Sequence, residues 1–139
     1  PTPKTSSAAS DVYKRQMYAL KIQSRNNLAS PDDVIDYLIQ VGTPDNVSAA
    51  LNIVEADEEL MEKVTRCVDV DRKDIDWYQA FNMDYSPSAY AGLVWAKSLY
   101  DGKAMTGKDL FGMIGCMTQK MRRHVLDGCS IAWKSSFVM

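Results

Sequence analysis

The sequence predicts a mainly α fold: a compact bundle of about five or six helices in a single domain. Helix starts recur along the chain, each a Ser, Thr or Asp ahead of apolar residues at helical spacing. The 139 residues leave room for one core, and 46% hydrophobic residues are enough to build it. A small β-hairpin or wing at the chain ends fits the same pattern, and an α+β fold is the alternative.

Residues 1–16 differ from the rest of the chain, because they are small and polar and show no apolar period. We predict that they form a disordered or non-native tail, followed by a single helical domain over residues 17–139. Within the tail, SDVYKRQ resembles translated sequencing-adapter read-through, which is seen in reading frames from metagenomic DNA. On that interpretation the natural protein starts at Met17. The far end, SSFVM, has no polar terminator, so it stays open whether the chain is cut short at Met139.

Three helices are predicted in the first half of the domain. Alternating apolar residues over 18–22 first indicate a short strand. Ser30, followed by a proline, then predicts a helix that ends at Gly42. Thr43, again followed by a proline, predicts a second helix directly after it, and a third is expected after Asp57.

The second half is predicted to hold two helical regions and a terminal strand. After a mixed stretch with a short helix near residues 75–81, Ser86 predicts a helix that stops at the Asp-Gly pair 101–102. The next helical region covers 107–126, is capped by the preceding threonine and is broken at two glycines. Residues 129–139 fit no helical period and are predicted to be strand, the start of a wing.

Aromatic residues are concentrated in one part of the chain, since seven of the thirteen lie between positions 77 and 100. We predict that these side chains form the main core of the domain. The alternative is a partly exposed aromatic patch that meets a protein partner.

Composition excludes several classes of protein. No apolar run approaches the ~20 residues of a membrane span, and residues 1–16 contain no apolar signal-peptide core. Three cysteines are an odd number, which favours free thiols in a reducing compartment over a disulfide framework. We therefore expect a cytoplasmic protein with no membrane partner.

Charge is unevenly distributed along the chain. Residues 55–84 carry ten acids and four bases, whereas residues 97–139 carry seven bases and three acids. The functional interpretation is a basic end that meets an anion and an acidic remainder that keeps the protein in solution. The simpler interpretation is chance clustering on a solvated surface.

Three short patterns point to cofactor or metal chemistry but lack residues that this chemistry needs. Segment 102–109 nearly matches a phosphate-binding P-loop, yet Asp109 stands where a hydroxyl should hold Mg²⁺. The acidic stretch 69–76 lacks the Gly and Glu of a calcium loop, so we interpret it as a solvated, helix-capping loop. The remaining candidate ligands are too few and wrongly spaced for zinc: Cys116, His124 and Cys129. We predict no cofactor, no metal, no catalytic residues and no enzymatic activity.

The most specific stretch is residues 106–126, TGKDLFGMIGCMTQKMRRHVL. Its first part is expected to form a short helix over 107–114, with Gly115 in a turn that needs a positive φ. Thr118 is expected to cap a second helix. Over these roughly twenty residues the chain resembles the helix-turn-helix of bacterial and phage transcriptional regulators.

The resemblance implies that the second helix contacts duplex DNA. It also implies that Met121 and Val125 pack back onto the first helix and that the small Cys116 lies buried under the turn. Gln pairs with adenine edges, and Arg with guanine edges or phosphates. The DNA-binding residues expected at the exposed start of the second helix are Thr118, Gln119, Lys120, Arg122 and Arg123.

The segment also departs from the family pattern. Phe111 stands where a small residue is preferred between the two helices, and His124 stands where an aliphatic residue is usual. Gly112 weakens the first helix by ~1 kcal/mol relative to Ala. A single, Met-rich amphipathic helix over the same residues is the alternative structure.

We predict from these observations a non-catalytic DNA-binding protein that uses its helix-turn-helix-like segment. The alternative belongs to a different class: a small protein-binding adaptor or inhibitor of bacterial or phage origin. It would act through an acidic and aromatic surface, and an acidic surface can mimic nucleic acid for a basic partner.

Overall fold

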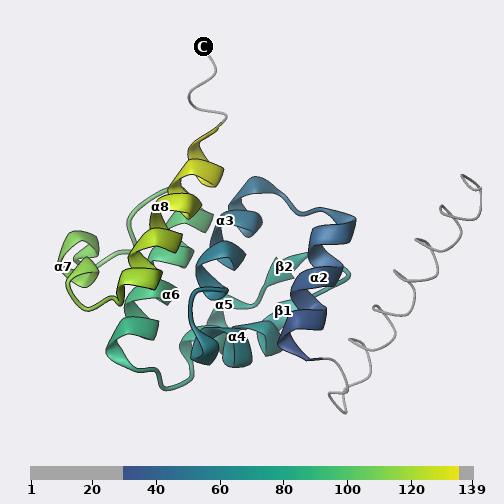
Figure 1. Ribbon diagram of the computed structural model, residues 1–139, viewed down its shortest axis with the longest axis horizontal. Coiled ribbons are helices and arrows are strands. Elements are labelled where there is room, and N and C mark those ends of the chain that lie inside the picture. The colour runs from purple at the N-terminus through teal and green to yellow at the C-terminus, as the bar shows by residue number, and fades with distance from the viewer. Residues whose placement is uncertain (1–29, 135–139) are drawn as a thin grey trace, which may run out of the picture.

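The computed structural model describes residues 30–134, and the fold over that range is mainly helical, as predicted (Figure 1). The predicted tail 1–16, the predicted strand 18–22 and residues 135–139 lie outside the described range. Within it, none of the helices has the length and apolar character needed to cross a membrane. The elements, in chain order, are α2 (Pro31–Val41), α3 (Asp45–Val54), α4 (Glu58–Val64), the 3₁₀ helix η1 (Thr65–Cys67), β1 (Val68–Asp69), β2 (Asp74–Ile75), α5 (Trp77–Phe81), α6 (Pro87–Asp101), α7 (Leu110–Ile114) and α8 (Gln119–Trp133).

Most helix starts follow the predicted capping chemistry. Each of four predicted residues accepts a hydrogen bond from a backbone N–H in the first helical turn: Ser30, Asp57, Ser86 and Thr118. The start of α3 is different. Thr43 does not cap this helix, because its hydroxyl pairs with the Ser48 hydroxyl at 2.5 Å, and the helix begins at Asp45 without a side-chain cap.

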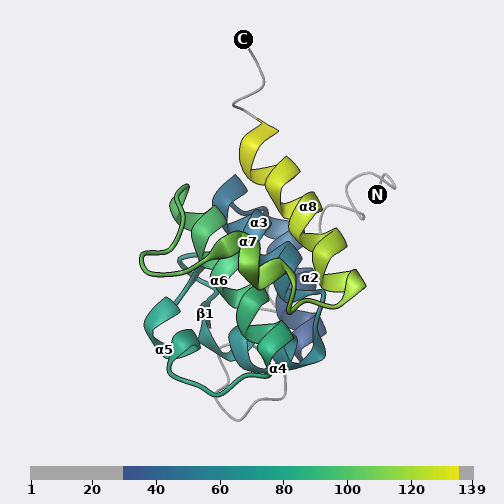
Figure 2. The same cartoon turned by 90° about the vertical axis from the view of Figure 1, so that its left-hand side faces the viewer.

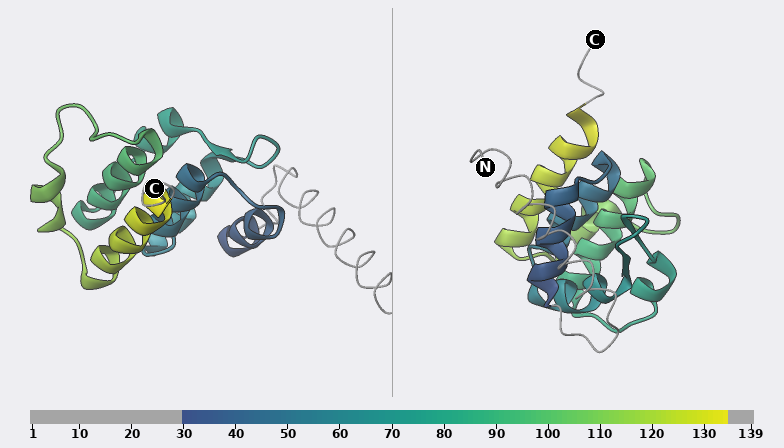
Figure 3. Two further views of the ribbon diagram at one scale, coloured as in Figure 1. Left: turned by 90° about the horizontal axis from the view of Figure 1, so that it is seen from above. Right: turned by 90° about the vertical axis from the view of Figure 1, so that its right-hand side faces the viewer.

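The core is built around α3, which packs against α6 and α8 (Figures 1 and 3). Small residues allow these helices to approach closely. A Cβ at Gly92 of α6 would lie 2.6 Å from the Met121 side chain of α8, and one at Gly128 would lie 3.3 Å from the Ala49 carbonyl oxygen of α3. The largest fully buried side chains are Leu38, Ile53, Leu60, Leu93, Met121, Val54, Val64 and Val94.

The prediction that aromatic residues form the main core is therefore only partly correct. Trp77 and Trp95 are buried, but Tyr78 is 83% exposed. Trp77 of α5 contacts Tyr100 of α6, with ring centroids 5.3 Å apart, so these rings pack the two helices together. The Tyr100 hydroxyl donates to Asp74 at 2.7 Å, and this bond, together with burial, raises the pKa of Tyr100 to about 12. Aliphatic side chains fill the centre instead, since they pack between three close helices.

The small sheet is internal to the described chain, not terminal as predicted. β1 and β2 form an antiparallel hairpin in which Val68 lies opposite Ile75. Asp69 at its turn accepts hydrogen bonds from two backbone N–H groups, and Asp76 caps α5 through the Gln79 N–H. The interpretation of this acidic stretch as a helix-capping loop is confirmed.

Residues Cys129–Trp133 are helical, so the strand or wing predicted to begin there is wrong (Figure 2). α8 continues because one side of it stays packed against the bundle. Met121, Val125 and Gly128 are buried, and Ala132 is half-buried, which gives a stripe at helical spacing.

His124 of α8 caps the C-terminal end of α3. Its ring Nδ1 lies 2.7 Å from the Asn52 carbonyl oxygen, and the Asn52 side-chain amide donates to the His124 carbonyl at 2.8 Å. Carbonyls in the last turn of a helix have no partner within the helix, and the imidazole N–H supplies one. This contact explains a polar residue where the helix-turn-helix family has an aliphatic one.

Replacing His124 with Leu is expected to lower the free energy of unfolding by about 1–2 kcal/mol, because the Asn52 carbonyl loses its donor. Urea denaturation followed by circular dichroism measures this loss. Ser130→Leu, at an exposed position of the same helix, is the control and should change stability by no more than ~0.5 kcal/mol. Equal effects of the two variants would show that the capping contact contributes nothing.

Candidate functional site

The helical region 107–126 is broken into two helices, so the alternative of one continuous Met-rich helix is wrong. α7 ends at Ile114 and α8 begins at Gln119. The five residues predicted to bind DNA all lie at the start of α8, and all five are exposed: Thr118, Gln119, Lys120, Arg122 and Arg123. The structure thus brings them together on one surface, which we call the α8 basic face.

The first helix is shorter than predicted, because it begins at Leu110 and not at Gly107. Gly107 has a φ of 76°, outside the helical range, and the cap is Asp109, not the preceding threonine. The Asp109 carboxylate accepts a hydrogen bond from the Gly112 N–H at 3.0 Å. A Cβ at Gly112 would lie 2.2 Å from that carboxylate, so the glycine accommodates the cap.

The turn between the helices also differs from the prediction. Gly115 has a φ of −62°, so the expected left-handed conformation is absent there. The chain instead leaves α7 through successive right-handed turns, in which the Cys116 N–H donates to Met113 and the Met117 N–H to Ile114. This path exposes Cys116, which was expected to be buried, and buries Met117 in its place.

α7 and α8 are each packed against α6 more than against one another. Met121 lies over Gly92 of α6, whereas the prediction placed it on the first helix. The Trp95 indole N–H of α6 donates to the Leu110 carbonyl at 2.9 Å and holds α7 in place. In Figure 2, α7 lies in front of α6 and beside α8, on the outside of the bundle.

The three basic residues of the face are not equivalent. The Arg122 Nε donates to the Ile114 carbonyl at 3.1 Å, so this side chain fastens α8 to the end of α7. Lys120 and Arg123 have no ion pair or side-chain hydrogen bond with any described residue. They are three positions apart on the helix and therefore lie on the same side of it.

The charges of the described chain are separated in space. Residues 30–101 carry fifteen acids and five bases, whereas residues 102–134 carry two acids and six bases. The elements with most of the acids, α2, α4 and the β1–β2 hairpin, lie away from α7, which occupies the opposite side of the bundle (Figures 1 and 3). The α8 basic face is thus a local positive surface on a protein that is acidic elsewhere.

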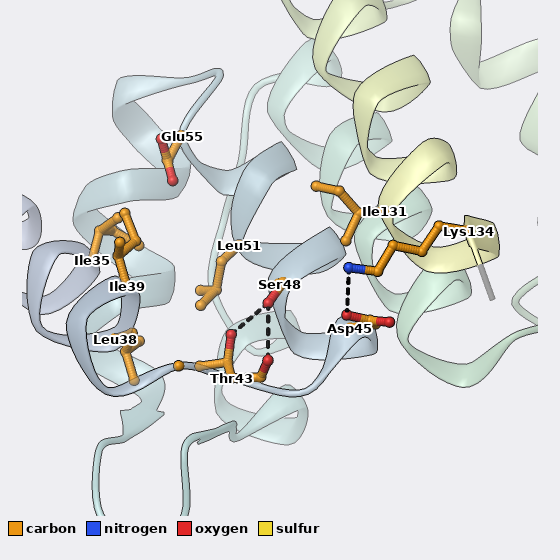
Figure 4. Close-up of a pocket in the computed structure, with 11 residues that line it drawn as sticks. Ile35, Leu38, Ile39, Thr43, Asp45, Ser48, Leu51, Glu55, Ile131 and Lys134 are labelled. Atoms are coloured by element: carbon orange, nitrogen blue, oxygen red, sulfur yellow. Dashed lines mark hydrogen bonds and ion pairs between the residues drawn. The ribbon is translucent and has the colours of Figure 1, made fainter.

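A separate groove of about 430 Å³ lies between α2, α3 and the end of α8 (Figure 4). Its apolar wall includes Leu38 and Ile131. Four of the polar groups at its rim are paired with each other: Lys134 with Asp45 at 3.4 Å, and the Thr43 and Ser48 hydroxyls. Partial burial raises the pKa of Glu55 at its edge, an effect that nearby His124 opposes. Because four of its five polar lining residues pair with one another, we assign no function to this groove.

The structure places the residues of the P-loop-like segment and of the candidate zinc ligands in the following settings. Segment 102–109 follows helix α6 and not the strand that a P-loop requires. His124 is engaged with α3, while Cys116 is exposed. Within residues 30–134, no three His, Cys, Asp or Glu side chains are arranged to hold a metal ion.

One exposed aromatic residue was missed by the sequence analysis. Phe111 was expected between the two helices, but 82% of its surface is exposed. Its outward direction depends on how α7 lies on α6, where the Phe111 ring meets the Trp95 ring edge to face.

Comparisons with family models, with curated proteins and with solved structures find no match to this chain.

Proposed function

We propose that the protein is a non-catalytic DNA-binding protein that contacts the DNA backbone and grooves through the α8 basic face. The observation that carries this proposal is the pair Lys120 and Arg123 in the first turns of a fifteen-residue helix. Both cations are exposed and have no acidic partner within residues 30–134. Unpaired cations attract phosphates, and the backbone N–H groups and dipole of a helix N-terminus add to that attraction.

The packing of α8 supports the same proposal. Its buried side is fixed by Met121, which is 0% exposed, and by Val125. The opposite side is therefore held toward solvent with little freedom to rotate. The Thr118 N–H donates to the Ser88 hydroxyl of α6 at 3.1 Å, which anchors the residue that caps the helix. A rigid helix presents its side chains to a groove in one orientation, as DNA recognition requires.

A protein-binding adaptor is the second candidate function, favoured by a different observation. Tyr78 is 83% exposed on α5, directly after the acidic β1–β2 hairpin. An exposed aromatic ring on an acidic surface fits a basic protein partner. This function requires no DNA binding, so one assay separates the two candidates.

The test is a fluorescence anisotropy titration of the protein into a random-sequence duplex at ~50 and ~200 mM salt. Affinity should fall about 12-fold between these conditions if Lys120 and Arg123 contact phosphates, and about 40-fold if one further cation does so as well. Failure to bind duplex DNA at the lower salt concentration would contradict the proposal and favour the adaptor.

A further inference from the structure

Two aromatic rings among the described residues are almost fully exposed, and their surroundings differ. Tyr78 lies on the acidic side of the molecule, whereas Phe111 lies on α7, next to the α8 basic face. The exposed Phe111 ring does not gain the free energy that burial would supply. Exposed apolar side chains of this kind often mark interaction sites.

Phe111 has one aromatic neighbour even though it is exposed. Its ring meets the Trp95 ring edge to face, with centroids 6.4 Å apart and planes at 79°. Trp95 is itself buried and is hydrogen-bonded to the carbonyl of Leu110, the residue before Phe111. The Asp109 cap fixes the first turn of α7. The backbone that carries the ring is thus fixed by the cap, and Trp95 gives the ring one aromatic neighbour.

The charge around this ring is positive. The Arg122 guanidinium is bonded to the Ile114 carbonyl, one helical turn from Phe111 on α7. Lys108 precedes α7 and lies over the Tyr90 ring at 5.2 Å. Asp109 is the only acid between residues 102 and 126, and its carboxylate is used by the helix cap. An anionic partner that offers a flat apolar face fits this surface.

We infer that Phe111 stacks on an unpaired base of nucleic acid bound to the α8 basic face. Phosphates supply the negative charge that Lys120 and Arg123 require, and every base has a π face on which an aromatic side chain can stack. In a fully paired duplex the base faces are covered by their neighbours, so DNA with unpaired bases should be preferred. This inference rests on the proposed function and adds that the preferred ligand is DNA with unpaired bases.

The experiment compares three probes of one sequence: a paired duplex, the same duplex with a central bubble of unpaired thymines, and the single strand. The parent protein should bind the bubble and the single strand about 5- to 150-fold more tightly than the paired duplex, the range expected for one stacked base. Phe111→Ala should abolish this preference and leave affinity for the paired duplex unchanged. Phe111→Tyr should restore it, because a phenol ring stacks equally well.

Tyr78→Ala is the matched control, since it removes a ring of equal exposure from the acidic side. It should keep the preference of the parent, and circular dichroism should show that all variants are folded at the assay temperature. Retention of the preference in Phe111→Ala, or an equal loss in Tyr78→Ala, would overturn the inference. A parent that binds the paired duplex and is indifferent to unpaired bases would overturn the stacking alone, whereas a parent that binds none of the probes would overturn the proposed function as well.

Discussion

Replacing Met121 with Ala is expected to lower the free energy of unfolding by about 2–5 kcal/mol. Met121 is fully buried, and its side chain occupies the space left by Gly92 of α6, next to Leu60 of α4. The substitution removes contacts to two other helices at once. The rigid helices on either side cannot close the resulting cavity, so the loss should exceed the transfer free energy of the missing atoms.

Urea denaturation at one temperature measures the effect of Met121→Ala. Leu126→Ala is the control on the same helix, because Leu126 is 69% exposed. It should change stability by no more than ~0.5 kcal/mol. A loss in Met121→Ala no larger than that of Leu126→Ala would show that α8 does not pack on α6 as described.

The second large effect is expected on DNA affinity. Replacing Lys120 and Arg123 together with Ala should weaken duplex binding on the order of 100-fold at ~50 mM salt, the contribution of two phosphate contacts. Stability should be unchanged, because neither side chain has a partner among the described residues. Arg122 is left in place, since it donates a hydrogen bond to the Ile114 carbonyl of α7. Its replacement would change the stability of the fold as well as DNA affinity.

The matched control for this double variant is Arg66→Ala with Arg72→Ala. It removes the same net charge from exposed positions in the acidic part of the chain. If long-range attraction governed DNA binding, both double variants would weaken it equally. We expect the control to retain parental affinity at moderate salt, because exposed charges more than about 10 Å apart are screened.

The sequence predicts the helix starts well because they depend on local chemistry. A Ser, Thr or Asp side chain reaches the backbone N–H groups two or three residues ahead, whatever the rest of the fold does. Ser30, Asp57 and Thr118 cap as expected for this reason. The exposure of the α8 basic face could also be predicted from the sequence, because helical periodicity separates Arg123 from Met121 and Val125.

The failed predictions depend on contacts between distant parts of the chain. The end of α8 remains helical because α8 packs on α3, about seventy residues earlier in the chain, and the local sequence of residues 129–133 does not reveal that packing. Gly115 stays right-handed because Met117, not Cys116, becomes buried. The bond of Arg122 to α7 and the outward direction of Phe111 likewise follow from how α7 lies on α6.

The most direct test of DNA binding through the α8 basic face is the slope of log K against log salt concentration for duplex DNA. The parent and the Lys120→Ala, Arg123→Ala double variant are compared over the same salt range. If both side chains contact phosphates, the slope should flatten by ~1.8 in the double variant. Equal slopes for the two proteins, each fully folded, would contradict the assignment of DNA binding to this face.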